Sequence, residues 1–323
     1  MNKVINFIGV DISMDTFNVH CFLQGDLLFN NTRSGFNALL KTLNENSWVV
    51  MESTGIYHLN LATFLFENEI RCSIVNPLSI KRFGQMKLNR NKTDKSDAKL
   101  IAQYSDSQNP TQWIPDELYI QQCKQIDSTV ELLIKQSTMI KNKIHSINNQ
   151  SIKVKTVLSS LKRQLKSKLK EIKLLEETMY SLIKENSQSM LSDLTSIPGV
   201  GPKTAVQLIV VTNGFNNTAS ASSLISYLGL SPTTYQSGSS IRGSSSISKK
   251  GNRRARGLLF MCSFTACSHN PQCKKLYDRL TAKGKSKKLA LIAVCNKLVK
   301  QCFAIANSGV RYDKSYKSTF NIH

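Results

Sequence analysis

Four acidic residues in the first hundred positions have the types and the spacing of a divalent-metal site. Asp94 and Asp97 are three residues apart in a segment that reads as the start of a helix, so their side chains share one helical face. Asp11 and Glu52 each follow a short apolar run that is typical of a strand. Carboxylate oxygens are the ligands that Mg²⁺ prefers, and one or two such ions assist the cleavage and joining of phosphodiesters. Taken singly, each acid could equally be a solvated turn or cap residue.

Other polar residues near these acids have simpler interpretations. Asp15 lies close to Asp11 in the sequence, but strand alternation carries its side chain away, so we expect a turn or strand-start residue. His58 is expected on a helix surface or in helix packing. Lys92 and Lys95 flank Asp94, where contact with a phosphate and simple charge balance are equally good interpretations.

The formal net charge of +22 over 323 residues predicts a polyanionic partner, with nucleic acid favoured over membrane. The charge is distributed unevenly. Residues 1–70 contain three Lys or Arg and seven Asp or Glu, whereas residues 242–300 contain fifteen basic residues and one acid. An ordinary solvated surface would mix both signs. The sequence therefore predicts an acidic N-terminal region, as a metal site needs, and a basic C-terminal region, as a phosphate-binding surface needs.

The cysteines and the apolar runs favour a cytosolic protein with reduced thiols. Eight cysteines are present without a CxxC pair. The group Cys262, Cys267, His269 and Cys273 does not have zinc-site spacing, so we expect small core residues there. Residues 1–10 lack the pattern of a signal peptide. We expect no apolar stretch of membrane-spanning length and no membrane partner, which favours the cytosol.

The front third alternates between strand and helix patterns. We expect strands at residues 4–10, 16–23, 26–32, 48–51 and 70–75. Helices are expected at residues 34–46, with Ser34 as a possible cap, at 57–68, and in a short segment that ends near Met86. This order predicts a mixed α/β sheet with helices on both faces.

The middle of the chain has the apolar spacing of two long helices. Apolar residues recur every three or four positions over residues 126–147 and again over 158–182, and polar residues 148–151 separate the two runs. These apolar stripes indicate that each helix packs along another helix, but they do not identify which one. We favour a protruding coiled-coil hairpin that also dimerises. Eight Lys or Arg residues decorate the second helix between positions 153 and 173. They are either a solvated face or a nucleic-acid contact.

The back third contains two segments suited to DNA phosphates. Residues 194–205 resemble the hairpin of a helix-hairpin-helix module, in which Gly199, Gly201 and Lys203 would contact the backbone. The alternative is a tight helix–helix turn without a ligand. Farther along, a serine-rich stretch precedes a cationic helix start. The cations that we expect to neutralise phosphates are Arg242, Lys249, Lys250, Arg253, Arg254 and Arg256.

The acids and the back third together resemble a known family. The front third, with its acids at strand ends and on a closing helix, is similar to the ribonuclease-H-like fold in its RuvC form. The segments 229–232 (GLSP), 236–238 (QSG) and 247–252 (ISKKGN) resemble the transposase domain of DEDD transposases from the insertion-sequence family one hundred and ten. These transposases are relatives of the Piv DNA invertase, and the resemblance covers nearly the whole chain.

The resemblance implies a division of the chain and a set of roles. It implies a RuvC-like DEDD domain at residues 1–110, a coiled-coil hairpin at 111–190 and a mainly α-helical transposase domain at 191–307. The tail at 308–323 has no pattern that indicates a structure, and we treat it as a mobile end. Asp11, Glu52, Asp94 and Asp97 match the metal-binding acids. Ser237 matches the proposed nucleophile, although neighbouring serines would be equal candidates on local chemistry alone.

The same resemblance implies the reaction and the partners. The protein would be a transposase or site-specific recombinase, acting through Mg²⁺-assisted phosphoryl transfer and a covalent serine–DNA intermediate. Its partners would be double-stranded DNA, at the element ends and the target, and a noncoding bridge RNA. The protein would form a homodimer that pairs into a tetramer on DNA. It would lie in a prokaryotic cytoplasm, on the nucleoid when it binds DNA.

Three other functions fit parts of the sequence. A RuvC-like metal-dependent nuclease, such as a junction resolvase, needs the four acids but has no use for the serine region. A nucleic-acid-binding scaffold would use the coiled coil and the basic surface, but it gains nothing from four clustered carboxylates. A degenerate transposase copy would have lost family residues, and each one that we compared is present.

Overall fold

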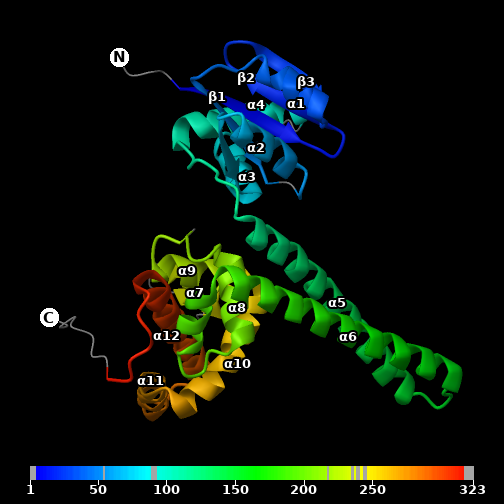
Figure 1. Ribbon diagram of the computed structural model, residues 1–323, viewed down its shortest axis with the longest axis vertical. Helices are drawn as coiled ribbons and strands as arrows, with labels where there is room; N and C mark the ends of the chain where they lie inside the picture. The colour runs from blue at the N-terminus through cyan, green and yellow to red at the C-terminus, as the bar shows by residue number, and fades with distance from the viewer. Residues whose placement is uncertain are drawn as a thin grey trace. The chain divides into compact units, whose positions relative to one another are not determined.

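The computed structural model describes residues 5–53, 55–88, 93–216, 218–233, 236–237, 241–242 and 246–315. The chain divides into two compact units, Met1–Pro115 and Asp116–His323 (Figure 1). The first unit is an α/β structure and the second is mainly helical. The α5–α6 hairpin and the back third therefore belong to the same compact unit.

The first unit is built on one mixed five-stranded sheet. Its strands are β1 (Asn6–Ile12), β2 (Thr16–Cys21), β3 (Gly25–Asn30), β4 (Ser47–Glu52) and β5 (Arg71–Val75). Their order in the sheet is β3-β2-β1-β4-β5; β1, β2 and β3 pair antiparallel, and β1, β4 and β5 pair parallel. The five predicted strands and the ribonuclease-H-like α/β fold are confirmed.

Helices cover both faces of this sheet, as predicted. The helices are α1 (Arg33–Leu40), α2 (His58–Glu67), α3 (Pro77–Met86) and α4 (Asp94–Gln108). One core lies between the sheet and α1 and α2, and it contains Val10, Met51 and Leu61. The other lies between the sheet and α3 and α4, and it contains Phe7 and Val50.

The prediction for α1 was wrong in its length and its cap. The N-cap is Thr32, whose Oγ1 accepts a hydrogen bond from the backbone N–H of Gly35 at 3.4 Å, and not Ser34. The helix ends at Leu40 because the next residues make local turns. Asn44 Oδ1 accepts hydrogen bonds from the backbone N–H of Asn46 at 3.0 Å and from Ser47 Oγ at 3.1 Å. Such local side-chain bonds offer the backbone an alternative to the helix.

Helix α4 crosses strand β1 at Gly9, where the two backbones touch. A Cβ atom at Gly9 would lie 2.0 Å from the carbonyl oxygen of Ala98 and 2.5 Å from the backbone nitrogen of Ala102. Real Cβ atoms do not approach backbone atoms this closely, so only glycine fits here. This contact fixes how deeply the helix that carries Asp94 and Asp97 sits on the sheet.

Gly9→Ala is expected to destabilise the protein by about 3 kcal/mol, because overpacking against backbone cannot be relieved by a rotamer change. The matched control is Gly257→Ala on α10 (Arg253–His269), where a Cβ meets no atom within 4 Å. Alanine there is expected to be neutral or mildly stabilising. Thermal unfolding followed by circular dichroism compares the two, and equal midpoints would contradict the close contact at Gly9.

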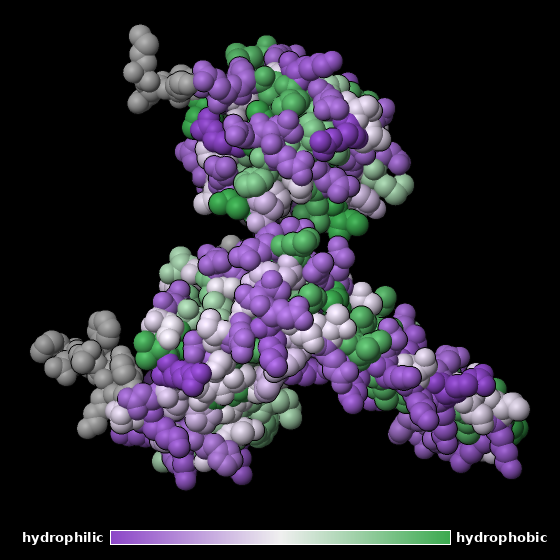
Figure 2. Space-filling model, viewed as in Figure 1, coloured by the Kyte–Doolittle hydropathy of each residue, from purple (hydrophilic) through white to green (hydrophobic). Residues whose placement is uncertain are grey.

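The second unit begins with two long helices that run along each other. They are α5 (Leu118–Asn148) and α6 (Lys155–Asn186). Among the predicted seam residues, Val130, Ser137 and Ile172 are buried, and Lys168 Nζ donates to Gln136 Oε1 across the pair at 2.6 Å. The two helices are therefore partners of each other. The visible surface of this hairpin is mostly hydrophilic with apolar residues between (Figure 2).

The rest of the second unit is a helical core with short strand pairs. The helices are α7 (Gln188–Thr195), α8 (Pro202–Thr212), α9 (Ala221–Tyr227), α10 (Arg253–His269), α11 (Pro271–Ala282) and α12 (Lys287–Ser308). Strand β6 (Pro232–Thr233) pairs with β9 (Ser246–Ile247), and β7 (Gln236–Ser237) pairs with β8 (Ile241–Arg242). The core also includes the proximal parts of α5 and α6, through Cys123 and Met179.

The cysteines of the second unit are buried core residues, except for Cys267, which is half-buried against the same core. Cys273 and Cys295 are fully buried, and burial raises the pKa of each thiol to about 12. Cys302 is also fully buried, and its thiol pKa is raised for the same reason. Among the residues that the structure describes, no three His, Cys, Asp or Glu side chains are placed to share a metal ion. Protonated, buried thiols behave as small apolar groups, which agrees with the interpretation of these residues as core.

Helix α12 corrects one expectation from the sequence. Its 22 residues are long and apolar enough to cross a membrane by composition, although we expected no such stretch. In the structure, its residues Val294, Leu298 and Val299 are fully buried in the helical core. The hydropathy of α12 is therefore explained by packing inside the unit.

The segment after α12 is anchored where we expected a mobile end. The backbone N–H of Tyr312 donates to Ser196 Oγ at 2.9 Å, and the Tyr312 hydroxyl donates to Asn270 Oδ1 at 3.1 Å. Burial also raises the pKa of the Tyr312 phenol. The prediction was wrong for residues 308–315, because these contacts lie far away in sequence; residues 316–323 lie outside the described part of the chain.

Candidate active site and nucleic-acid interface

The pairing of β1 with β4 places Asp11 and Glu52 on the same face of the sheet. Gly9 is opposite Val50 in the parallel register. Side chains alternate along a strand, so Asp11 shares the face of Gly9, and Glu52 shares the face of Val50. This is the face that α4 covers, since α4 touches Gly9 and Val50 is buried in the core beneath α3 and α4. Both acids are half-buried.

The other two acids lie in the first turn of α4. Thr93 caps the helix, and it forms a capping box with Ser96: each side-chain oxygen accepts a hydrogen bond from the other residue's backbone N–H, at 3.2 and 2.8 Å. Acids in a first turn are favoured by the helix dipole, which is the structural role they would have without a metal. Asp94 is exposed and Asp97 is half-buried. The residue after Asp97 is Ala98, which contacts Gly9, two residues before Asp11.

The backbone therefore brings the acids to one face, at the end of β1 and β4 and the start of α4. Their side chains do not converge further: the described residues contain no three acids, histidines or cysteines close enough to hold one ion. Carboxylate oxygens are the kind of ligand that a hard cation such as Mg²⁺ prefers. The side chains of the four acids would have to rotate towards one another to complete a metal site. Asp15 is exposed in the bend before β2, as predicted. His58 is buried, which agrees with a packing role.

The sequence interpretation missed a His–Asp pair on the same face of the sheet. His20 is opposite Gly9 on one side and Asp26 on the other, and His20 Nδ1 lies 2.5 Å from Asp26 Oδ1. The hydrogen bond from His20 lowers the pKa of Asp26, and the charges of Lys95 and Lys99 lower it as well. The alternating pattern of the two strands could have revealed the pair. Asp26 also gives Lys95 an acidic neighbour. This supports the interpretation that Lys95 balances local negative charge.

The predicted nucleophile Ser237 lies in β7, opposite Ile241 of β8. Its side chain, that of Arg242, and residues 238–240 and 243–245 lie outside the described part of the chain. The pairing of Pro232 with Ile247 closes the base of this segment. The backbone of Ser237 therefore lies in the stretch between β6 and β9, which precedes the start of α10 in sequence.

The cations around α10 divide into exposed and buried groups. Lys249, Lys250 and Arg253 are exposed, so they are available to phosphates. Arg256 is half-buried, and its Nη1 donates to the carbonyl oxygen of Leu228 at 2.9 Å. The position of Arg254 is different again, since only 9% of its side chain is exposed.

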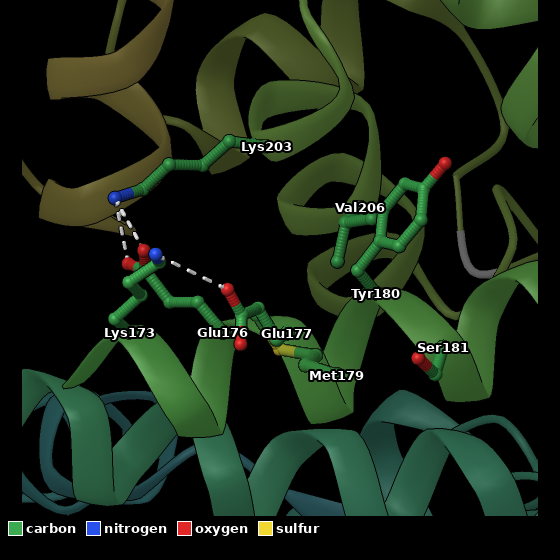
Figure 3. Close-up of a pocket in the computed structure, with 8 residues that line it drawn as sticks. All are labelled: Lys173, Glu176, Glu177, Met179, Tyr180, Ser181, Lys203 and Val206. Atoms are coloured by element: carbon green, nitrogen blue, oxygen red, sulfur yellow. Dashed lines mark hydrogen bonds and ion pairs between the residues drawn. The ribbon is translucent and has the colours of Figure 1, made fainter. Parts of the chain in front are cut away.

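Arg254 is held by two carboxylates from the α5–α6 hairpin. Its Nη1 donates to Asp127 Oδ1 of α5, and its Nη2 donates to Glu176 Oε1 of α6 at 2.8 Å. Lys203 of α8 also reaches Glu176, with Nζ–Oε1 2.6 Å (Figure 3). Gln207 Nε2 donates to Asp127 Oδ2 at 2.8 Å. These contacts place Arg254 and Lys203, two predicted phosphate contacts, at the junction between the hairpin and the helical core. The Arg254 side chain is largely buried there, whereas 53% of the Lys203 side chain is exposed.

The two glycines of the α7–α8 turn have different surroundings. Gly199 has a φ of +104°, and a Cβ there would lie 2.8 Å from Ala266 Cβ and 2.9 Å from its backbone nitrogen. Contact with α10, rather than with a phosphate, accounts for this glycine. Gly201 is the N-cap of α8 without a side-chain cap, and a Cβ there would meet open space. The described geometry therefore favours a tight helix–helix turn at Gly199 and leaves room for a ligand at Gly201.

Comparison with known proteins identifies both parts of the chain. Residues 8–151 match the family model of the IS110-type DEDD transposases, described as "Transposase". Residues 191–278 match the model of the transposase IS116/IS110/IS902 family.

Individual relatives support the same assignment. The chain is 31% identical over 321 residues to the pilin gene-inverting proteins of Moraxella lacunata and Moraxella bovis, which covers 95% of this chain and 98% of each relative. It is 36% identical over 120 residues to an uncharacterised protein of insertion element IS110 from Streptomyces coelicolor, covering 37% of this chain and 29% of that protein. The chain therefore belongs to the IS110 family of DEDD transposases, and it is an enzyme of this transposase and DNA-invertase family.

Proposed function

We propose that this protein is a site-specific DNA recombinase of an insertion sequence that cuts and rejoins DNA through a covalent serine–DNA ester. The observation that carries the proposal is the placement of Asp11 and Glu52 on the face of the sheet that α4 covers with Asp94 and Asp97. Two family models that match the acid-bearing unit and the serine-bearing unit support it.

The four acids would hold one or two Mg²⁺ ions. When bound, such an ion polarises a scissile phosphate and stabilises negative charge on the leaving oxygen. Asp11 and Glu52 come from rigid, paired strands, and Asp94 and Asp97 come from a capped helix whose depth is set at Gly9. Acids on such elements keep their backbone positions while their side chains rotate to the ligand.

Ser237 would attack the phosphorus of the scissile phosphate. The bond between Ser237 Oγ and phosphorus forms, the bond from phosphorus to one deoxyribose oxygen breaks, and that oxygen leaves as a hydroxyl after the serine proton is transferred. A hydroxyl from a second DNA end then attacks the ester, which releases Ser237 and joins the strands. A serine hydroxyl needs activation for this step.

The partners of the reaction would be held by the basic surfaces. Lys249, Lys250 and Arg253 are exposed beside the segment that carries Ser237, and they would neutralise DNA phosphates with a strong salt dependence. We propose that a bridge RNA supplies target choice by base pairing, since shape and backbone suffice for a protein to hold such an RNA. The α5–α6 hairpin would act as a coiled-coil element in a dimer that pairs into a tetramer on nucleoid DNA, in the cytoplasm.

A strand-cleavage assay tests this proposal. It uses labelled element-end DNA, Mg²⁺ and the flanking RNA of the element, with wild type, Ser237→Ala and Asp97→Ala, on denaturing gels before and after protease. We expect a protease-sensitive, protein-linked DNA band in the wild type that both substitutions abolish. Free nicked DNA that persists in Ser237→Ala and disappears in Asp97→Ala would establish a metal-dependent nuclease instead.

A further inference from the structure

Three large apolar side chains are exposed in the turns that follow the two acid-bearing strands of the first unit. Met14 is 62% exposed, Ile56 is 73% exposed and Tyr57 is 37% exposed. Met14 lies in the turn that follows β1, three residues after Asp11. Ile56 and Tyr57 lie in the turn that follows β4, a few residues after Glu52. None of the three belongs to either core of this unit.

One asparagine ties the two turns together. Asn31 Nδ2 donates to the carbonyl oxygen of Ser13 at 2.8 Å and to that of Tyr57 at 3.5 Å. The backbone N–H of Asn31 also donates to the carbonyl oxygen of Asp15 at 2.7 Å. The turn around Met14 is closed by a hydrogen bond from the Ser13 hydroxyl to the carbonyl oxygen of Thr16 at 2.8 Å. The backbone that presents these side chains is therefore organised before any partner arrives.

The position of this cluster indicates what would cover it. Single exposed apolar residues are ordinary on a protein surface. Here, however, two turns that immediately follow the strands with the acids both expose apolar side chains, and a hydrogen-bond frame joins them. A phosphate bound at the four acids, through the Mg²⁺ that they would hold, would bring the sugar and base of the same nucleotide to these turns. Bases offer flat apolar faces that stack on aromatic side chains, and apolar side chains such as Met and Ile insert between base steps.

We propose that Met14, Ile56 and Tyr57 form an apolar platform that binds unstacked nucleobases next to the scissile phosphate. The inference rests on the proposed function in one respect, which is that a DNA strand lies at the four acids. It adds a base-contacting surface with a defined chemistry: Tyr57 stacks on a base, and Met14 and Ile56 contact its apolar edge or the neighbouring step. The platform would read no sequence, because every base has a face that stacks.

The test uses the full chain and two single-stranded oligonucleotides of equal length. One is oligo-dT and the other is an abasic strand, which keeps the phosphates and lacks the bases. Fluorescence anisotropy gives both affinities for the wild type, for Tyr57→Ala and for the triple variant Met14→Ser, Ile56→Ser, Tyr57→Ala. The matched control is Leu23→Ser, since Leu23 is 79% exposed in the β2–β3 turn at the other end of β2.

We expect the wild type and Leu23→Ser to prefer oligo-dT over the abasic strand by about tenfold, as loss of one stacked base would predict. Tyr57→Ala should remove most of this preference, and the triple variant should remove all of it, with affinity for the abasic strand unchanged. A strand that carries 5-iodouracil should crosslink on irradiation to the peptide that contains Tyr57. Circular dichroism melting shows whether each variant is folded.

Two outcomes would overturn the platform. One is an unchanged preference for bases in a folded triple variant, and the other is crosslinking confined to residues 116–315. The strand-cleavage assay separates this failure from that of the proposed function. Cleavage with an intact serine ester in a triple variant that keeps its base preference removes the platform alone. Base preference through Tyr57 in a wild type that forms no protein-linked DNA retains the platform and removes the recombinase.

Discussion

Asp11→Asn is expected to lower the rate of strand cleavage by about a thousandfold and to leave the melting temperature close to that of the wild type. The substitution keeps the size and shape of the side chain and removes its charge. A metal ligand that loses its charge forfeits several kcal/mol of transition-state stabilisation, and about 4 kcal/mol corresponds to three orders of magnitude in rate. Asp11 is half-buried at the end of β1, so an amide there should not disturb the core.

Asp15→Asn is the matched control, because Asp15 is an exposed acid four residues farther along. We expect it to cleave DNA at the wild-type rate. The assay is the single-turnover formation of protein-linked DNA at saturating Mg²⁺, with folding checked by circular dichroism. Equal rates for Asp11→Asn and Asp15→Asn would remove Asp11 from the reaction and leave its carboxylate with a structural role only.

Arg254→Gln is expected to destabilise the second unit by about 3 kcal/mol. The guanidinium is 9% exposed, and the carboxylates of Asp127 and Glu176 that flank it are 15% and 20% exposed. Removing one partner of a buried ion pair leaves the other charges buried and uncompensated, and such losses typically cost about 3–5 kcal/mol. Two carboxylates from different helices lose their shared cation here, although Lys203 still neutralises Glu176. The low end of that range therefore applies.

A double-mutant cycle separates this network from a general loss of charge. Asp127→Asn together with Arg254→Gln should cost clearly less than the sum of the two single substitutions, because the double variant leaves no unpaired charge between these two residues. Arg253→Gln is the neighbouring control: Arg253 is exposed, so its loss should leave stability unchanged. Urea unfolding gives the free energies, and additive costs in the double variant would contradict the buried pair.

Substitutions of Arg253 and Arg254 should have different effects on the salt dependence of DNA binding. We expect Arg253→Gln to reduce the slope of log affinity against log salt by about one, as the loss of one phosphate contact predicts. Arg254→Gln should leave the slope unchanged under conditions in which the variant is folded, because its cation faces Asp127 and Glu176. Fluorescence anisotropy with duplex DNA over a range of salt concentrations measures both slopes, and a lower slope for Arg254→Gln would return Arg254 to the DNA-binding surface.

Local patterns in the sequence determined most of the secondary structure. Apolar runs predicted five strands that the structure contains, and the spacing of three and four residues predicted α5 and α6 with the break between them. The ends were less certain wherever polar side chains bind nearby backbone groups. Asn44 ends the first helical region early in this way, and Thr32 takes the cap that Ser34 also fits. The end of α1 and its N-cap both depend on which of several neighbouring polar side chains bonds to the nearby backbone groups.

The sequence also identified the four acids as candidate metal ligands. That they lie on one face of the sheet is seen only in the fold. The sequence placed Asp11 and Glu52 at strand ends, but only the parallel pairing of β1 with β4 puts both on one face. The docking of α4 on that face, with Ala98 against Gly9, brings Asp94 and Asp97 there. The pair of His20 with Asp26 depends on antiparallel register between two strands. Register and helix docking are set by contacts between residues that are distant in sequence, so composition and spacing do not encode them visibly.

The roles of the charged residues are where the prediction from the sequence and the structure differ most. The cationic run before and within α10 reads as one phosphate-binding stretch, because each Arg or Lys carries the same charge in the sequence. The fold divides it by burial: Arg253 faces solvent, whereas Arg254 is enclosed by Asp127 and Glu176, which come from positions far earlier in the chain. Likewise, α12 reads as apolar enough for a membrane, and the helices around it bury its apolar face. The sequence by itself determined which groups are present, and the tertiary structure decided which of them solvent and nucleic acid can reach, because burial depends on what the rest of the chain brings alongside.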